Sequence, residues 1–490
     1  MNYLISKKTK IVATIGPSSQ DKETLKKLIA NGMTCMRLNF SHGSHEEHLK
    51  KINTLRETER EEGVIIPIAL DTKGPEIRTG CFKGGFADFK RGTKVTIKMK
   101  ADELGDNTCF GVTYPNLFED AIENTVLRLD DGNLELLIVE KNKKDRTLIC
   151  EVRNDHVCKD RRGVNCPQAH LTMPYLSKQD IDDLVFGCQQ HVDFVFASFV
   201  RNANDIKDIR TLLDSNGGKN ISIISKIENT EAIENLESVI RESDGVMVAR
   251  GDLGIEIPAE LVPVYQKKII HLCRHYGKPV ITATQMLDSM IRNPIPTRAE
   301  VSDVAWAIEE GTDAVMLSGE SANGIYPAES VQMQSRIALA IEKQFDYDES
   351  RSTAFRNSDK TISDAIANAV SETAAIIDAK MILTISSSGA TAMRIARTRP
   401  VCPTFVVSNE IDTLKHVMLY YGCYPYHVKT LPQFAEEMEV LAIKISKDYN
   451  LNVGDRIIVT GGTLIGSGNT NFMKVITVPS KDKYISRKED

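Results

Sequence analysis

The stretch Ile224-Ser-Lys-Ile-Glu-Asn229 lies about one βα unit before the stretch Val248-Ala-Arg-Gly-Asp-Leu253. Each follows a run of apolar, β-branched residues, a pattern that predicts a buried strand of a parallel sheet. We therefore expect Lys226, Glu228 and Asp252 to converge at neighbouring strand ends. One cation beside two metal-binding carboxylates suits transfer or cleavage at a phosphorylated or carboxylated small molecule. For any one of these residues alone, a surface ion-pair network is the alternative.

The rest of the chain repeats this strand pattern, with amphipathic helical segments between the strands. Such βαβα alternation is typical of a parallel sheet covered by helices. Ser177-Lys-Gln-Asp180 and Thr297-Arg-Ala-Glu300 resemble capping boxes and predict helix starts. Eight strands with this alternation predict a TIM barrel. The expected strands are residues 10–15, 35–40, 67–71, 194–199, 221–227, 245–249, 279–283 and 314–317.

The third and fourth expected strands lie about 120 residues apart, far more than a βα connection needs, which indicates an inserted domain. Apolar and polar residues alternate at four places in it, and Asp130-Asp-Gly132 predicts a hairpin turn. We expect a small antiparallel β-barrel that serves as a lid at residues 73–172, with the TIM barrel at 1–72 and 173–345. The alternating segments are 94–99, 125–129, 134–139 and 147–152.

The C-terminal part predicts a further domain at residues 346–490. It begins with a polar, turn-rich stretch, 346–360, which we interpret as a linker. Strands and helices then alternate again and predict an open α/β sheet. Its expected strands are residues 381–385, 404–407, 424–428 and 456–459.

Composition and charge narrow the functional classes. The net charge is -6, and no Lys/Arg run with interleaved aromatic residues occurs, so we expect a small substrate and no nucleic acid. Ten cysteines without a C-x-x-C pair predict free thiols in a reducing compartment. No apolar run of about eighteen residues occurs, and the first expected strand leaves no room for a signal peptide. These features favour a cytoplasmic protein without a membrane span.

Nearly every expected barrel strand ends in a chemically useful group, at the rim where TIM-barrel active sites lie. A purely structural barrel has no reason to gather charged groups at one rim, so the set indicates an active site. The groups are Arg37-Leu-Asn-Phe-Ser41, Asp71-Thr72, Ser198, Lys226 with Glu228, Asp252, Thr284, and Ser318 with Glu320.

These stretches closely resemble the pyruvate kinase family, in the family's order along the barrel. The resemblance implies transfer of the phosphoryl group of phosphoenolpyruvate to ADP, the last step of glycolysis, and protonation of the enolate to pyruvate. It also implies a homotetramer. The matching stretches are Thr9-Lys-Ile-Val-Ala-Thr-Ile-Gly-Pro17, 37–43, Asp71-Thr-Lys-Gly-Pro-Glu-Ile-Arg-Thr-Gly80, 224–229, 247–254, Ala283-Thr-Gln-Met-Leu287 and Met316-Leu-Ser-Gly-Glu-Ser321.

The resemblance assigns substrate and metal roles to the strand-end residues. Glu228 and Asp252 would hold Mg²⁺ or Mn²⁺ together with substrate oxygens, because Mg²⁺ prefers one or two carboxylates beside such oxygens. Lys226 would lie against the transferring phosphoryl group and neutralise its oxygens. Arg37 resembles another phosphoryl contact.

A second group of residues would bind the substrate carboxylate. The backbone N–H groups of Arg250, Gly251 and Asp252 open a predicted helix and suit an anion, and Gly251 permits close approach. Thr284 would complete that pocket, and a water near it is a route for the proton to the enolate.

In the family, residues matching Asn39, Ser41, Asp71 and Thr72 bind potassium. For Asn39 or Ser41 alone, ordinary capping and turn hydrogen bonds are the alternative. Glu76 indicates the potassium-dependent class, because a lysine at that position would supply its own cation.

Three residues resemble nucleotide contacts: His42, Arg78 and Arg162. For His42, a loop histidine bonded to backbone is the alternative. The segment Arg161-Arg-Gly-Val-Asn165 has arginines where the family often has lysines, which leaves the nucleotide preference open. Trp306 stands where the family often has asparagine, and we interpret it as packing in the core or at a subunit interface.

In the C-terminal domain, Ser386-Ser-Ser-Gly-Ala-Thr391 offers hydroxyls and helix N–H groups to a phosphate. By resemblance, Ser386, Ser388 and Thr391 would bind a phosphorylated allosteric effector. Plain helix capping without an effector is the alternative. The loop at 461–468 lacks the Lys-Ser/Thr ending of a P-loop and any basic residue, which argues against fructose bisphosphate.

Two other functions remain open from the residues alone. One is a metal-dependent lyase or aldolase of a related barrel that binds pyruvate-like acids. The other is a catalytically silent effector-binding protein, against which the intact Lys226, Glu228 and Asp252 argue.

Overall fold

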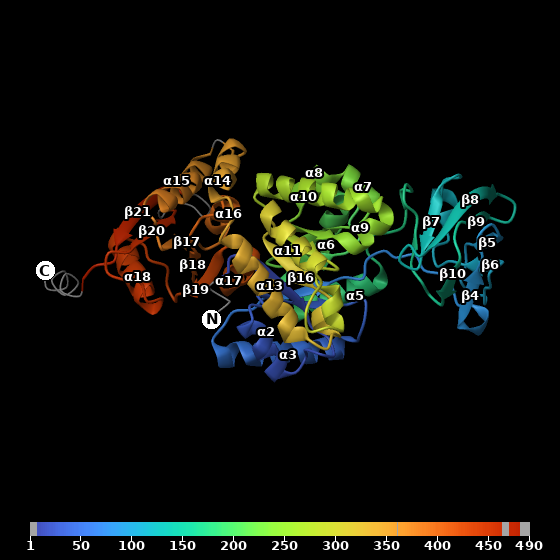
Figure 1. Ribbon diagram of the computed structural model, residues 1–490, viewed down its shortest axis with the longest axis horizontal. Coiled ribbons are helices and arrows are strands. Elements are labelled where there is room, and N and C mark those ends of the chain that lie inside the picture. The colour runs from blue at the N-terminus through green and yellow to red at the C-terminus, as the bar shows by residue number, and fades with distance from the viewer. Residues whose placement is uncertain (1–6, 360, 463–469, 481–490) are drawn as a thin grey trace.

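The computed structural model describes residues 7–359, 361–462 and 470–480. Figure 1 shows three bodies in a row: a β-rich inserted domain at one end, a barrel in the middle, and an α/β domain at the other end. This arrangement leaves one rim of the barrel facing the inserted domain, whereas its opposite end packs against the C-terminal domain.

The predicted TIM barrel is confirmed. Eight parallel strands close in the order β1-β16-β15-β14-β13-β12-β3-β2. Nearly all their residues are buried on both faces, which explains the continuous apolar runs in the sequence. The strands are β1 (Lys10–Thr14), β2 (Cys35–Asn39), β3 (Ile68–Asp71), β12 (Phe194–Ala197), β13 (Ser222–Ile227), β14 (Gly245–Ala249), β15 (Val280–Ala283) and β16 (Ala314–Leu317).

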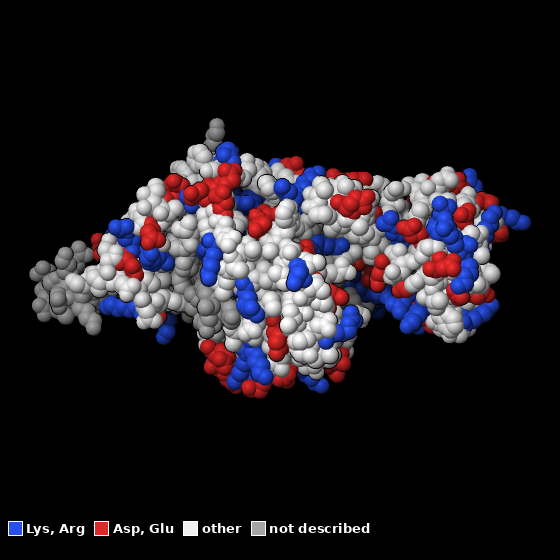
Figure 2. All heavy atoms as spheres, viewed as in Figure 1, with Lys and Arg blue, Asp and Glu red and all other residues white. Residues whose placement is uncertain are grey.

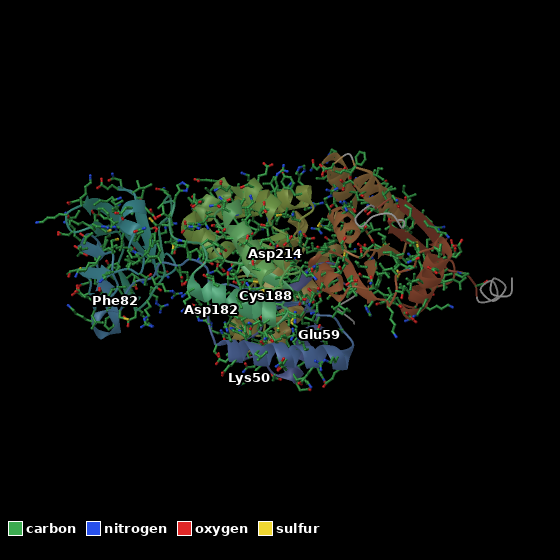
Figure 3. All side chains as sticks on the ribbon, turned by 180° about the vertical axis from the view of Figure 1, so that it is seen from behind. Lys50, Glu59, Phe82, Asp182, Cys188 and Asp214 are labelled. Atoms are coloured by element: carbon green, nitrogen blue, oxygen red, sulfur yellow. The ribbon has the colours of Figure 1, made fainter. Side chains whose placement is uncertain are left out.

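Helices surround the barrel and bury one apolar face each against it. The capping boxes predicted at Ser177 and Thr297 are both present, with Asp180 and Glu300 as their partners. Figure 3 shows this layer from behind, with Lys50 on α3 and Asp182 and Cys188 on α5. The helices are α2 (Lys22–Ala30), α3 (His45–Glu62), α5 (Lys178–Gln189), α6 (Ala203–Ser215), α7 (Thr230–Glu234), α8 (Leu236–Glu242), α9 (Arg250–Glu256), α10 (Val262–Tyr276), α11 (Arg298–Glu310), α12 (Gly319–Ala322) and α13 (Pro327–Glu342), with short 3₁₀ helices at Ala259–Leu261 and Asp288–Ile291.

The inserted domain is a small β structure, as expected. Six strands form one sheet in the order β11-β7-β8-β9-β5-β6, and β10 pairs with β4 in a separate two-stranded ladder. All pairs are antiparallel except β5 with β6, and both sheets share one apolar core. The elements are β4 (Phe86–Phe89), β5 (Lys94–Lys98), β6 (Cys109–Gly111), β7 (Val126–Leu129), β8 (Leu134–Asn142), β9 (Thr147–Val152), β10 (His156–Lys159), β11 (Val164–Asn165), α4 (Leu117–Asp120) and a 3₁₀ helix at Lys83–Gly85.

The C-terminal domain is an open sheet in the order β19-β18-β17-β20-β21, with the predicted parallel strands and an antiparallel edge strand, β21, that we did not predict. The loop interpreted at 461–468 lies mostly outside the described residues. The elements are α14 (Tyr347–Arg356), α15 (Ile362–Ile376), β17 (Met381–Ile385), α16 (Ala390–Arg397), β18 (Thr404–Ser408), α17 (Ile411–His416), a 3₁₀ helix at Val417–Leu419, β19 (Cys423–His427), α18 (Ala435–Asp448), β20 (Arg456–Gly461) and β21 (Phe472–Thr477).

One sequence interpretation is wrong, and one of the two alternatives for Trp306 is excluded. The stretch 346–360 is not an irregular linker, because α14 occupies most of it, capped by the Asp346 side chain and packed against the domains on either side. The core alternative for Trp306 is excluded, because the side chain is 53% exposed and its indole N–H donates to Glu310 Oε1 at 2.7 Å, whereas packing at a subunit interface stays a prediction. The polar composition of α14 misled us, because a helix needs only one buried face to be held in a fold.

The cysteines and the surface charges agree with the expectations from composition. All ten cysteines are free thiols, as predicted. On the face shown in Figure 2, acidic and basic side chains are intermingled. Within the described part of the chain, no helix combines the length and apolar character needed to cross a bilayer.

Candidate active site

Lys226 is the centre of a buried polar cluster at the carboxyl ends of the barrel strands. Its Nζ lies 2.8 Å from Ser198 Oγ, 2.9 Å from Glu228 Oε1 and 3.2 Å from Asp71 Oδ1. Burial opposes the charged form, but Asp71 and Glu228 outweigh it and raise the pKa of Lys226 above its usual range. The ammonium group is therefore charged and held in one position.

Arg37 supplies a second buried cation beside the same carboxylate. Its Nε donates to Asp71 Oδ2 at 2.6 Å, and its Nη1 donates to Thr14 Oγ1 at 2.8 Å. Burial alone would raise the pKa of Asp71, yet Arg37 and Lys226 together hold it below its usual value. Asp71 is consequently ionised and aligns both cations.

Glu228 is fully buried and has one neighbour for each carboxylate oxygen. The Phe199 N–H donates to Oε2 at 2.7 Å, whereas Oε1 lies 2.9 Å from Lys226 Nζ. Burial raises the pKa of Glu228 to about 8 although Lys226 favours the ionised form, and the charge of Asp252 adds to the rise. Such a carboxylate is suited to a metal ion.

The partner carboxylate comes from the neighbouring strand. β13 and β14 pair in parallel, with Ile227 opposite Val248, so Asp252 at the start of α9 follows the same edge as Glu228. Within the described ranges no group of three or more His, Cys, Asp or Glu side chains could hold a metal by itself. A two-carboxylate site completed by substrate oxygens matches the preference of Mg²⁺.

The groups expected to bind the substrate carboxylate are hydrogen-bonded to one another. Thr284 Oγ1 accepts the Gly251 N–H at 2.7 Å and donates to Ala283 O at 2.6 Å. Thr284 has φ +71° and Phe199 has φ +55°, rare backbone conformations for a β-branched and a bulky residue. Strained residues of this kind cluster at functional sites.

Arg250 does not direct its side chain at the cluster. Its guanidinium lies 2.5 Å from Asp303 Oδ1 and donates to Thr284 O at 2.7 Å, which fixes the loop after β15. Only the backbone of Arg250 is left for a ligand.

The four residues matched to a potassium site lie at the ends of adjacent strands, since Asn39 and Asp71 are register partners in β2 and β3, and Ser41 and Thr72 follow these strands. Asn39 Oδ1 accepts the Ser41 N–H at 3.1 Å, and Thr72 Oγ1 accepts the Ser198 N–H at 3.0 Å. These residues follow one edge of the barrel, and the oxygens of Asn39 and Thr72 serve the local turn bonds of the alternative interpretation.

A cleft of about 350 Å³ separates the barrel rim from the inserted domain, within the size range of small-molecule sites. His42, Arg78 and Arg162 all line it, together with Asp252. Arg78 Nη2 donates to Glu76 Oε2 at 2.7 Å. Barrel and inserted domain therefore contribute to one cleft, as a lid over the rim would.

The loop matched to an effector site is largely satisfied by its own hydrogen bonds. Ser386 Oγ accepts the Gly389 N–H at 2.9 Å, and Thr391 Oγ1 lies 2.6 Å from Thr470 Oγ1. Ser388 is exposed. This geometry agrees with the capping alternative and leaves one hydroxyl facing solvent.

Sequence reasoning overlooked several contributors. Ser198 was noticed only as a strand-end group, yet it bonds Lys226, and Thr14 was not noticed at all. Glu256 also lines the cleft and accepts from Asn165 of the inserted domain at 2.8 Å. Only the position of Ser198 at a strand end was a usable signal, because the other contacts join segments remote in sequence.

Comparisons with known proteins agree with this geometry. Sequence models of the pyruvate kinase barrel domain and of the pyruvate kinase alpha/beta domain match residues 6–331 and 364–476. A pyruvate kinase of Sporosarcina psychrophila is 45% identical over 470 residues, 96% of this chain and 80% of the relative. One of Clostridium perfringens is 43% identical over 475 residues, 96% of this chain and 99% of the relative. A crystal structure of a pyruvate kinase from Cryptosporidium parvum superposes with a TM-score of 0.93 at 36% identity, covering 98% of this chain and 97% of that one. The chain therefore belongs to the pyruvate kinase family of phosphotransferases.

Proposed function

We propose that the barrel rim passes the phosphoryl group of phosphoenolpyruvate to ADP, giving pyruvate and ATP, with Lys226 against the transferring group. The contacts of the Lys226 ammonium group support this role. Asp71 and Glu228 keep it charged, and Ser198 helps to fix its position. A fixed cation stabilises the charge of a loose phosphoryl-transfer transition state without reacting itself. Arg37 adds a second cation for the phosphoryl oxygens.

We assign Glu228 and Asp252 as the ligands of Mg²⁺ or Mn²⁺. The burial of Glu228 and its position at a strand end beside that of Asp252 support this assignment. When bound, the ion would supply Lewis-acid stabilisation of the phosphoryl and enolate oxygens. The substrate carboxylate would take the N–H of Gly251 in exchange for the hydroxyl of Thr284, beside the backbone of Arg250.

Potassium is the proposed monovalent cofactor, bound by Asn39, Ser41, Asp71 and Thr72. Glu76 brings no cation of its own, and the carboxylate of Asp71 would favour one. This cation would offset part of the negative charge of phosphoenolpyruvate.

ADP would bind in the cleft between the barrel and the inserted domain. His42, Arg78 and Arg162 line this cleft, and both arginines are placed to meet phosphate oxygens. The inserted domain would then close over the substrates as a lid and exclude water.

The proposal extends to the assembly and compartment. We propose a cytoplasmic homotetramer, which the free thiols support as far as a reducing compartment is concerned. A phosphorylated effector would act at Ser386, Ser388 and Thr391. The proposed domain limits are 1–72 and 173–345 for the barrel, 73–172 for the lid and 346–490 for the C-terminal domain.

The test is to quantify pyruvate and ATP in the same reaction of phosphoenolpyruvate and ADP with Mg²⁺ and K⁺. We expect equal amounts, and we expect Glu228→Gln to lose both products together, because it removes a metal ligand. Pyruvate and inorganic phosphate released without ATP would show hydrolysis in place of phosphoryl transfer and would contradict the proposal. Neither product from the native protein would identify a silent effector-binding protein.

A further inference from the structure

The loop after β15 begins with two consecutive residues whose φ angles are positive. Thr284 has φ +71° and Gln285 has φ +54°. This conformation is unfavourable for residues with a side chain, above all for a β-branched one, so it persists only where the surrounding structure enforces it. Since Thr284 belongs to the proposed carboxylate pocket, the contacts that enforce its backbone bear on substrate binding.

The guanidinium group of Arg250 binds two consecutive carbonyl oxygens of this loop. Its Nε donates to Ala283 O at 3.2 Å, and its Nη2 donates to Thr284 O at 2.7 Å. One of these carbonyl groups precedes the Cα atom of Thr284 and the other follows it, so the two bonds restrain both φ and ψ of this residue. The planar fork of an arginine suits two such acceptors, which a lysine ammonium would not match.

The carboxylate of Asp303 fixes the guanidinium group in turn. Arg250 and Thr284 each follow their strand directly, because Ala249 and Ala283 are register partners in β14 and β15. Arg250 Nη1 lies 2.5 Å from Asp303 Oδ1, and the Arg250 side chain is only 12% exposed. A charge-assisted bond in such a setting is stronger than one between neutral groups. Asp303 of α11 therefore acts on the backbone of Thr284 through Arg250.

The far end of the loop has an anchor of its own. The Leu287 N–H donates to Glu320 Oε1 at 3.1 Å, and the Ser318 N–H donates to Glu320 Oε2 at 2.8 Å. Glu320 is buried. Loss of the Arg250 contacts should consequently free the backbone at Thr284 without releasing the whole loop.

We propose that Arg250 and Asp303 are positioning residues of the phosphoryl-transfer site, acting on the substrate carboxylate through Thr284. This inference rests on the proposed function. In the structure, the Thr284 hydroxyl accepts the Gly251 N–H at 2.7 Å and donates to Ala283 O at 2.6 Å. A bound carboxylate that takes the Gly251 N–H makes this hydroxyl turn toward it. Because Arg250 restrains the backbone on both sides, only the side chain of Thr284 turns.

The first test measures the two KM values of Asp303→Ala. Asp303 lies within a helix and its side chain is 35% exposed, so alanine is tolerated there. KM for phosphoenolpyruvate should rise about tenfold, because the carboxylate partner is misplaced. KM for ADP should stay within about twofold of the native value, because the nucleotide is proposed to bind at other residues.

The matched control is Asp214→Ala on α6, labelled in Figure 3. Asp214 has a similarly exposed side chain, 44%, and also pairs with an arginine, Arg210. It should keep both KM values. A loss of folded protein alone lowers the apparent kcat and leaves KM unchanged. If Asp303→Ala shows only that, or raises both KM values equally, the positioning role is wrong.

The second test asks whether the two residues act as a unit. Arg250→Lys keeps the charge but not the fork, so KM for phosphoenolpyruvate should rise at least as much as in Asp303→Ala. The double variant should be no worse than Arg250→Lys alone, because Asp303 then has no fork left to fix. Effects that multiply would show that the residues act independently and would overturn the proposal.

The native protein is the reference that separates this inference from the proposed function. If it forms neither pyruvate nor ATP, the proposed function fails and this inference fails with it. If it forms both while the KM values of Asp303→Ala equal the native ones, only the positioning roles of Arg250 and Asp303 fail.

Discussion

The two ends of the barrel both bury charged side chains, but the charges are balanced at one end and unbalanced at the other. At the rim, Arg37 and Lys226 are matched by Asp71 and Glu228. At the opposite end, the seam with the C-terminal domain, Arg394, Arg397 and Arg399 share two carboxylates, and Arg274 pairs with none among the described residues. Charge pairing is thus complete where the strand ends meet and incomplete where two domains meet.

The largest effect should come from Lys226→Met, which breaks the charge balance at the barrel rim. It removes the charge while roughly preserving side-chain length, so turnover should fall by roughly a thousandfold or more if Lys226 stabilises the transferring phosphoryl group. Glu228 and Asp252 remain, so the metal–pyruvate complex should still form. The methyl protons of pyruvate should then still exchange with solvent through a water near Thr284.

Deuterium uptake into pyruvate, followed by NMR beside ATP formation, separates the two roles of Lys226. Retained exchange with lost transfer supports the phosphoryl role. Joint loss of both activities with the metal site intact would make Lys226 the proton donor instead.

Asp313→Asn should weaken the seam by removing one of its two carboxylates. It leaves Arg399 buried without a counter-charge, which typically costs about 3–5 kcal/mol of unfolding free energy. Asp348→Asn is the matched control, because its partner Arg351 meets an 87% exposed carboxylate and such pairs contribute roughly 0–1 kcal/mol. Urea unfolding of both variants measures the difference, and equal losses would show that the seam does not depend on its charge balance.

Potassium dependence tests whether the rim lacks a cation, as Glu76 implies. Replacing potassium by tetramethylammonium should lower activity by roughly a hundredfold, the cost of losing one fixed charge near the transition state. Glu76→Lys should restore part of it, whereas Glu76→Gln breaks the bond to Arg78 without adding a cation and serves as the control. Native rates that are the same in both salts would refute the potassium assignment.

Glu256 should make stability depend on pH at the edge of the rim cleft. Burial raises its pKa to about 6, so the folded state holds its proton more tightly than the unfolded chain does. The stabilisation is complete below about pH 4.3 and is lost as pH rises through 6, a change of about 2 kcal/mol. Glu256→Gln keeps the hydrogen bond from Asn165 and removes this dependence. Native and variant unfolding curves measured from pH 4.5 to 7.5 should therefore diverge, and parallel curves would contradict the assignment.

The smallest effect on basal turnover is expected at the loop of residues 386–391 in the C-terminal domain. Replacing Ser386, Ser388 and Thr391 by alanine should leave turnover nearly intact and abolish activation by any phosphorylated effector, since the coupling needs both sites. The lost bonds to Gly389 and Thr470 should lower the unfolding free energy by roughly 1–2 kcal/mol. An effector to which the triple variant responds unchanged would place its site elsewhere.

Barrel strands were predictable because burial on both faces forces continuous apolar runs, and the observed bounds differ from the expected ones by two residues at most. The short strands β4, β6 and β10 of the inserted domain were missed, because each has only three or four residues and too little alternation to be recognised. The helix α14 was missed because its polar residues resemble those of a linker.

The sequence by itself determined the barrel, its insertion and the chemical identity of the rim groups, since period and strand-end position are local properties. Only the tertiary structure decided how the charges pair. Lys226 meets Asp71 across 155 residues of chain, and Arg399 meets Asp313 across 86. Whether a buried charge is matched or left over depends on which distant segments pack together, and no local pattern encodes that balance. This is why the rim was visible in the sequence and the cationic seam was not.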